Sequence, residues 1–90
     1  MAFTKTDAIE RARQDLAARL HVKNEEIRAS AEDAEFPDAA LGATIDGEMS
    51  AQMITPGWRI KLEVGGKTHE YRANKNQLRL HNFKGRNYKL

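Results

Sequence analysis

Apolar and polar residues alternate most regularly along residues 58–64, where every second side chain from Trp58 onward is apolar and the others are charged. This period of two predicts a β-strand with one buried face. Gly65 and Gly66 follow directly and can adopt the positive φ angles of a two-residue hairpin turn. The sequence therefore predicts an antiparallel hairpin whose second strand returns through residues 67–73.

The turn also sets the register of the predicted hairpin. Counting outward from the glycine pair gives four mainly apolar pairs on one face: Val64–Lys67, Leu62–His69, Ile60–Tyr71 and Trp58–Ala73. The opposite face then carries Glu63–Thr68, Lys61–Glu70 and Arg59–Arg72. A slip of one residue would expose the apolar side chains of the first strand, so we expect this register to be held firmly.

The N-terminal region has the period of a helix. Its apolar residues recur at spacings of three and four and form one narrow stripe: Ile9, Ala12, Leu16 and Leu20. Thr4 or Thr6 can serve as the N-cap, and Asp7 follows in the first turn, where a carboxylate suits the helix dipole. The sequence therefore predicts a helix from about Thr6 to Leu20 that lies close against a sheet.

Several further segments complete the predicted sheet. Residues 27–31 and 49–54 alternate weakly and are interpreted as strands, and residues 77–81 alternate again as the third strand of the meander. Thr55-Pro56-Gly57 places proline and glycine at the two central positions of a type II turn. Residues 32–47 are polar and predict a long loop, which in so small a domain is either mobile or functional.

These elements predict an α+β fold with one N-terminal helix packed on a three- to four-stranded, mainly antiparallel sheet. We expect a single domain over residues 1–82 and a basic, flexible C-terminal tail over residues 83–90. The predicted core contains Ile9, Ala12, Leu16, Leu20, Ile27, Leu41, Ile54, Trp58, Ile60, Leu62, Tyr71, Leu78 and Leu80.

The composition limits the compartment and the chemistry that we expect for the domain. The chain has 90 residues and no cysteine, which excludes a disulfide framework and thiolate chemistry and suits a reducing compartment. Its first residues lack the apolar segment of a signal peptide, and no apolar run approaches the roughly 18 residues of a membrane span. We therefore expect a cytoplasmic protein without a membrane partner.

Charge is divided unevenly between two parts of the chain. Residues 1–58 contain six Lys and Arg against eleven Asp and Glu, a net charge of −5, whereas residues 59–90 contain nine against two, a net charge of +7. Two interpretations stay open: a surface for a polyanion, or two halves that attract each other within one domain.

Two sequence motifs occur together in this chain. Residues 36–42 read Phe-Pro-Asp-Ala-Ala-Leu-Gly, and residues 51–60 read Ala-Gln-Met-Ile-Thr-Pro-Gly-Trp-Arg-Ile. In this order, the aromatic-Pro-Asp-x-x-Leu-Gly and Thr-Pro-Gly-aromatic patterns resemble a family of small, uncharacterised, mainly bacterial domains over residues 9–74. The resemblance implies an α+β fold and no established activity.

The first functional hypothesis is a non-catalytic protein-interaction domain. Its candidate surface is the loop of Phe36, Pro37, Asp38, Leu41 and Gly42, in which we expect Phe36 to be partly exposed. Asp38 follows a proline and is expected to accept backbone N–H bonds two residues on, while Leu41 attaches the turn to the core.

The second hypothesis is nucleic-acid binding through the basic C-terminal part. Single-strand binding proteins combine cations that contact phosphates with aromatic rings that stack on bases. The candidate residues are Arg59, Lys61, Arg72, Arg79, Lys84, Arg86, Tyr88 and Lys89. The alternative for the same residues is a solvated face that keeps the domain in solution.

The third hypothesis is a small enzyme or metal-binding protein centred on His69 and the acidic loop. Glu35, Asp38, Asp46 and Glu48 offer oxygen ligands, but their spacing matches no calcium loop, and the histidines lack the spacing of a metal motif. A catalytic His69 would need a partner that the sequence does not identify. We therefore predict no enzyme activity, no metal and no cofactor, with an unknown protein partner.

The open edge of the last strand suits a monomer or a weak homodimer.

Overall fold

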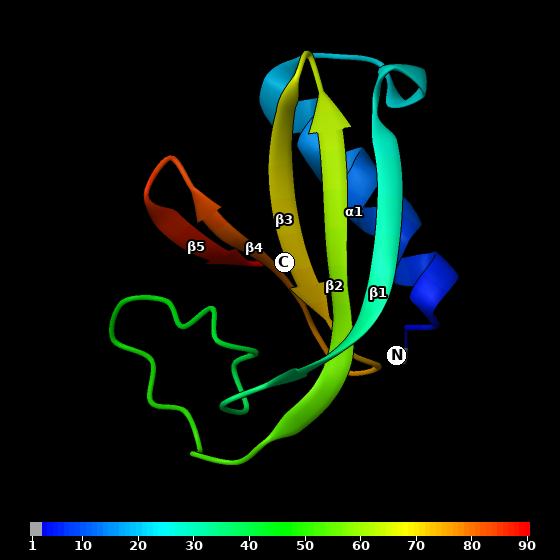
Figure 1. Cartoon of the computed structure of the whole chain (residues 1–90). Coiled ribbons are helices and arrows are strands. Elements are labelled where there is room, and N and C mark those ends of the chain that lie inside the picture. Colours follow the sequence, from blue (N-terminus) through cyan, green and yellow to red (C-terminus); the bar gives the residue numbers. More distant parts are fainter. Residues whose placement is uncertain (1–2) are drawn as a thin grey trace.

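A computed structural model describes residues 3–90, which form one long helix and a five-stranded sheet (Figure 1). The elements in chain order are α1 (Lys5–Leu20), a 3₁₀ turn η1 (Asn24–Glu26), β1 (Arg28–Phe36), β2 (Thr55–Val64), β3 (Lys67–Ala73), β4 (Leu78–Phe83) and β5 (Arg86–Lys89). Neighbouring strands are antiparallel, in the order β1-β2-β3-β4-β5. The predicted α+β class is confirmed, but the sheet has five strands where the sequence predicted three to four.

Helix α1 begins one residue earlier than predicted because Thr4 is its N-cap. The Thr4 hydroxyl accepts the backbone N–H of Asp7 at 3.1 Å, and the Asp7 carboxylate accepts the N–H of Thr4 at 3.3 Å. This reciprocal pair satisfies two N–H groups that the helix itself leaves unpaired. Ile9 and Leu20 are only partly buried, so the buried stripe is Ala8, Ala12, Leu16 and Ala17.

The central hairpin has the predicted register in full. All seven predicted pairs between β2 and β3 are present, from Val64–Lys67 at the turn to Trp58–Ala73 at the far end. Ile60, Leu62 and Tyr71 are completely buried on the face that α1 covers. The period-two pattern and the glycine turn were therefore sufficient to define this part of the sheet.

The first two strands are longer than the sequence predicted. Strand β1 continues to Phe36 through residues assigned to the loop, and β2 begins at Thr55 instead of after a type II turn. The pairing of β3 with β2 ends at Trp58, so residues 55–57 pair only with β1. Pro56 fits in this overhang because proline is tolerated where a strand is open on one side.

Residues 37–54 connect β1 to β2 and cross the face of the sheet opposite α1, so the sheet lies between a helix and a loop. Figure 1 shows this connection, in green, apart from the helix. The sequence predicted a strand over residues 49–54 with Ile54 in the core, and both predictions are wrong. Met49, Met53 and Ile54 are exposed by 97, 58 and 69%. The backbone here bonds within the loop, since the carbonyl of Ala51 accepts the N–H groups of Ala39 and Met53.

The C-terminal residues belong to the sheet. The sequence predicted a flexible tail over residues 83–90, whereas Phe83 ends β4 and Arg86–Lys89 pair with β4 as β5. Gly85, at φ +84°, allows the tight turn between them, and the N–H of Leu90 donates to the carbonyl of Leu78 at 3.0 Å. The segment assigned to the tail is therefore part of the sheet. Within residues 3–90, no helix is both long and apolar enough to cross a membrane.

A buried hydrogen bond joins the sheet to α1. The Tyr71 hydroxyl donates to the Asp15 carboxylate at 2.7 Å, and Asp15 also pairs with Arg19 at 2.7 Å. Burial and the bond to Asp15 raise the pKa of Tyr71 well above its ordinary value. The ring is completely buried, so its hydroxyl has no access to water.

We expect Tyr71→Phe to lower the free energy of unfolding by about 1–2 kcal/mol, because a hydrogen bond to a charged group is lost. Urea unfolding followed by circular dichroism measures the loss. Tyr88→Phe is the matched control, since the Tyr88 hydroxyl bonds to no group within residues 3–90 and its loss should change stability by less than about 0.5 kcal/mol. Equal effects of the two substitutions would contradict the role given to Asp15.

Candidate functional site

The Phe36–Gly42 loop forms the turn that the sequence predicted. The Asp38 side chain accepts the backbone N–H groups of Ala40 at 2.9 Å and Gly42 at 3.0 Å, and Leu41 is completely buried. Gly42 has φ +67°, and a Cβ added there would lie 2.6 Å from a terminal nitrogen of Arg72. Glycine is therefore favoured by the backbone angle, and a larger residue would also have to shift the Arg72 guanidinium.

Two of the five candidate residues in this loop, Phe36 and Leu41, are buried. Phe36 is only 2% exposed, so the prediction of partial exposure is wrong. Two guanidinium groups lie near its ring, with Arg59 at 5.7 Å and Arg72 at 5.3 Å from the ring centroid. Of the five candidate residues, only Pro37 is exposed. A partner could reach Phe36 and Leu41 only if this loop left the sheet.

Four candidate nucleic-acid contacts lie in one row across the sheet, on the loop side. The register places Arg59, Arg72, Arg79 and Lys89 beside one another on β2, β3, β4 and β5. Glu70 separates the first two charges, with a carboxylate oxygen 3.5 Å from Arg59 and 2.6 Å from Arg72. Arg59 also pairs with Glu32 at 3.5 Å. These carboxylates offset the like-charge pair Arg59–Arg72 that the hairpin register imposes.

Arg79 attaches the loop to the sheet. It is 3% exposed, and its two terminal nitrogens donate to the two carboxylate oxygens of Glu48 at 2.6 and 2.7 Å. It also donates to the carbonyl of Ala43 at 3.2 Å, and Arg72 donates to the carbonyl of Leu41 at 3.0 Å. The hydrogen bonds from Arg79 hold the pKa of Glu48 down to about 2. The structure thus buries Arg79 against the loop, and it leaves Arg72 only partly exposed with its guanidinium bonded to Leu41 and Glu70.

The aromatic rings near the C-terminus are also occupied. The Arg19 guanidinium of α1 lies 4.4 Å from the ring centroid of Tyr88 and 5.6 Å from that of Phe83. Stacking of a base on the face of Tyr88 that Arg19 covers would have to displace this arginine. Four of the basic candidates stay exposed: Lys61, Lys84, Arg86 and Lys89.

The three histidines lie in separate environments. Burial lowers the pKa of His69, Lys67 lowers it further, and the ring contacts Phe83 at a centroid distance of 5.8 Å. Burial also lowers the pKa of His81, which lies 3.9 Å from Glu70. His21 ends α1 in a left-handed conformation with φ 56°. Within residues 3–90, no three His, Cys, Asp or Glu side chains are grouped closely enough to hold a metal ion.

The structure instead draws attention to the outer edge of β1. This nine-residue strand pairs only with β2, in a continuous register from Arg28–Glu63 to Phe36–Thr55. No hydrogen bond from elsewhere in residues 3–90 reaches its other backbone edge. Glu32, Asp33 and Glu35 are exposed along it, so the edge is acidic.

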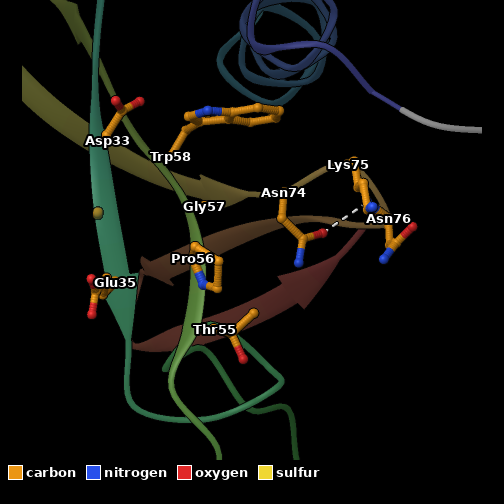
Figure 2. Close-up of a pocket in the computed structure, with 10 residues that line it drawn as sticks. Asp33, Glu35, Thr55, Pro56, Gly57, Trp58, Asn74, Lys75 and Asn76 are labelled. Atoms are coloured by element: carbon orange, nitrogen blue, oxygen red, sulfur yellow. Dashed lines mark hydrogen bonds between the residues drawn. The ribbon is translucent and has the colours of Figure 1, made fainter.

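A pocket of about 700 Å³ lies where β1 and β2 extend past the end of β3, and residues 33–35 of β1 form part of its lining. Figure 2 shows Trp58 at one end of the pocket and Pro56 with Thr55 at the other, with Asp33 and Glu35 along β1. The turn of Asn74, Lys75 and Asn76 forms the remaining side, held by a 2.8 Å bond from the Asn76 N–H to the Asn74 side-chain oxygen. Trp58 is partly buried, so one part of its indole packs on the core while another part lines the pocket.

Sequence reasoning missed this site for an identifiable reason. Glu32, Asp33 and Glu35 were interpreted as loop because they interrupt the alternation of apolar residues after Ala31. An edge strand needs only one partner strand and tolerates charged side chains. The signal that was present is the alternation of Ala29 and Ala31, whose pairing partners Leu62 and Ile60 are completely buried.

The comparison with known proteins found a family of unknown function, in agreement with the resemblance seen in the sequence. A family model described as a domain of unknown function, DUF8738, matches residues 9–81. No curated protein and no solved structure matches the chain. Since the model covers most of the sequence, the chain belongs to the DUF8738 family of domains of unknown function.

Proposed function

We propose that this domain is a non-catalytic protein-interaction module that takes an extended, positively charged segment of its partner as a sixth strand beside β1. The observation that carries the proposal is the unpaired backbone edge of β1, nine residues long and uninterrupted by proline or a bulge. Exposed edges of this kind are the sites at which a partner strand adds through main-chain hydrogen bonds.

Charge determines which segment suits this edge. Glu32, Asp33 and Glu35 lie close together near the C-terminal end of β1, and a partner strand with Lys or Arg would face them with the opposite charge. If a second copy of β1 paired so that the two acidic ends met, the three carboxylates of each strand would lie close to those of the other. The acidic side chains therefore oppose self-pairing and favour a cationic partner.

The other edge of the sheet is the weaker candidate. Strand β5 has only four residues, and the side chain of Asn87 on it donates to the carbonyl of Thr44 in the loop at 2.8 Å. Residues 44–46 lie against this strand and line a recess with it. A partner strand would have fewer backbone groups to pair with there than along β1.

The test is an NMR titration of the ¹⁵N-labelled chain with the nonapeptide Lys-Val-Lys-Val-Lys-Val-Lys-Val-Lys. We expect saturable shifts of the amides of residues 28–36 and much weaker shifts with the matched peptide in which glutamate replaces lysine. Equal binding of both peptides, or shifts away from β1, would overturn the proposal. Light scattering of the free protein shows whether a second copy occupies the edge instead.

Proline substitutions locate the binding edge. Successive N–H groups of a strand point to opposite sides. Of the substitutions Ser30→Pro and Ala31→Pro, one therefore removes an N–H that bonds to β2, and the other removes an N–H that points outward from the sheet. We expect one variant to retain its stability and lose peptide binding, and the other to lose about 3 kcal/mol of stability. Retained peptide binding in the stable variant would contradict strand addition.

The same kind of NMR titration tests the nucleic-acid alternative. A single-stranded oligonucleotide that shifts the amides of Lys61, Lys84, Arg86 and Lys89, and still does so at physiological salt, would favour that function over peptide binding. We expect such shifts, if any appear at low salt, to vanish as salt screens the four exposed cations.

A further inference from the structure

We infer that the pocket around Trp58 accepts an arginine side chain of the segment added to β1, so that the module selects partners with arginine at one position. This inference rests on the proposed function. It goes further by assigning the pocket a ligand and the partner a specificity residue.

The position of the pocket calls for a long side chain. Asp33 and Glu35 share the α1 side of the sheet with Trp58 and Pro56, their cross-strand partners in β2. A strand added outside β1 would lie about 4.8 Å from it and would send alternate side chains to this same side. To enter the pocket, such a side chain has to pass across β1, which Arg and Lys can do and short residues cannot.

The chemistry of the lining favours a cation. Tryptophan is the aromatic residue on which cations bind best, and here its indole is accompanied by two exposed carboxylates, Asp33 and Glu35. The Asn74 side-chain oxygen is already used by the N–H groups of Asn76 and Gln77. Arginine suits this lining better than lysine because its planar guanidinium can stack on the indole while it donates to a carboxylate.

The chain already places a cation of its own beside one of these carboxylates. The ammonium group of Lys5 in α1 lies 3.1 Å from the Asp33 carboxylate, whose side chain is 86% exposed. Exposed pairs of this kind are weak and screened by salt, so an incoming guanidinium can displace it. Lys75, on the opposite side of the pocket, repels a cationic ligand. Both carboxylates are therefore needed to make binding of a cation favourable.

Trp58 provides the readout because it is the only tryptophan of the chain. The probes are two nonapeptides, Lys-Val-Lys-Val-Xaa-Val-Lys-Val-Lys, with either arginine or its uncharged isostere citrulline at Xaa. We expect the arginine peptide to change the emission of Trp58 and to bind about two- to fivefold more tightly than the citrulline peptide. Asp33→Asn should reduce this difference, and Lys5→Ala should strengthen binding of the arginine peptide. Lys23→Ala, which removes a lysine beyond the other end of α1, is the control.

The outcomes separate the two claims. If β1 amides shift with both peptides, but the affinities are equal and Trp58 emission is unchanged, the arginine pocket is refuted and strand addition stands. If no peptide shifts the amides of residues 28–36, the proposed function fails and the inference fails with it. Arginine-selective emission changes together with β1 shifts would support both.

Discussion

Gly57→Ala is expected to destabilise the domain more than any other single-methyl change in the sheet. A Cβ built on Gly57 would overlap the backbone oxygen of Ala73 and would lie 3.3 Å from the Phe36 ring. Backbone in a paired strand cannot move aside as a flexible side chain does, so β2 and β3 would have to separate where they meet. We expect a loss of about 3 kcal/mol or more, a large part of the roughly 5–15 kcal/mol by which small domains are stable.

Thermal and urea unfolding measure this effect, and Gly47→Ala is the matched control. Gly47 has φ +81° and no atom within 4 Å of its added Cβ, so alanine there meets backbone strain alone and should cost about 1 kcal/mol. If the two substitutions prove equally costly, the close approach of β3 to Gly57 is not what demands glycine at that position.

Arg79→Met is expected to release the loop of residues 37–54 from the sheet while the helix side of the domain stays folded. The substitution removes both bonds to Glu48 and the bond to Ala43, and it leaves the Glu48 carboxylate without its partner. Loss of one member of a buried ion pair costs about 3–5 kcal/mol. Hydrogen exchange should therefore become faster at the amides of Ala40 and Gly42.

Arg86→Met serves as the control for this prediction, because Arg86 is exposed on β5 and its loss should change stability by less than about 0.5 kcal/mol. Unchanged protection of the loop amides in the Arg79→Met variant would show that Asp38 and the buried side chains hold the loop without the arginine.

The same ion pair predicts a dependence of stability on pH. Arg79 holds the pKa of Glu48 near 2 in the folded protein, below the ordinary value of 4.5 that applies when the chain is unfolded. A lowered folded pKa means that the unfolded chain binds the proton first, so the contribution of Glu48 is complete above pH 4.5 and is lost as pH falls toward 2. Glu48→Gln should flatten this part of the pH–stability curve. If stability falls at acid pH in the same way in that variant, other carboxylates cause the loss.

Local sequence signals accounted for the parts of the fold that depend on residues close together in the chain. The glycine turn fixed the β2–β3 register, Thr4 with Asp7 formed the expected start of α1, and Asp38 bonded to backbone N–H groups of its own turn. Each of these structures depends on residues within a few positions, or on a strict period of two, so the sequence contains all the information needed.

Prediction failed where the deciding neighbour was distant in the chain. Phe36 is buried because Arg59 and Arg72 lie beside its ring, and Arg79 is buried because Glu48, thirty-one positions earlier, pairs with it. Seven basic residues therefore looked like a free cationic surface in sequence. Three of them, Arg59, Arg72 and Arg79, turned out to hold the loop or its aromatic residue. The other four, on β2, on β5 and in the turn between β4 and β5, stayed exposed.

By itself, the sequence determined the class of fold, the central hairpin and the start of the helix, because turn chemistry and side-chain period act locally. Only the tertiary structure decided that β1 extends to Phe36 as a free acidic edge, that β2 overhangs β3, and that Trp58 lines the resulting pocket. A strand edge and a pocket arise from the pairing of segments far apart in the chain. Composition and period do not specify those pairings.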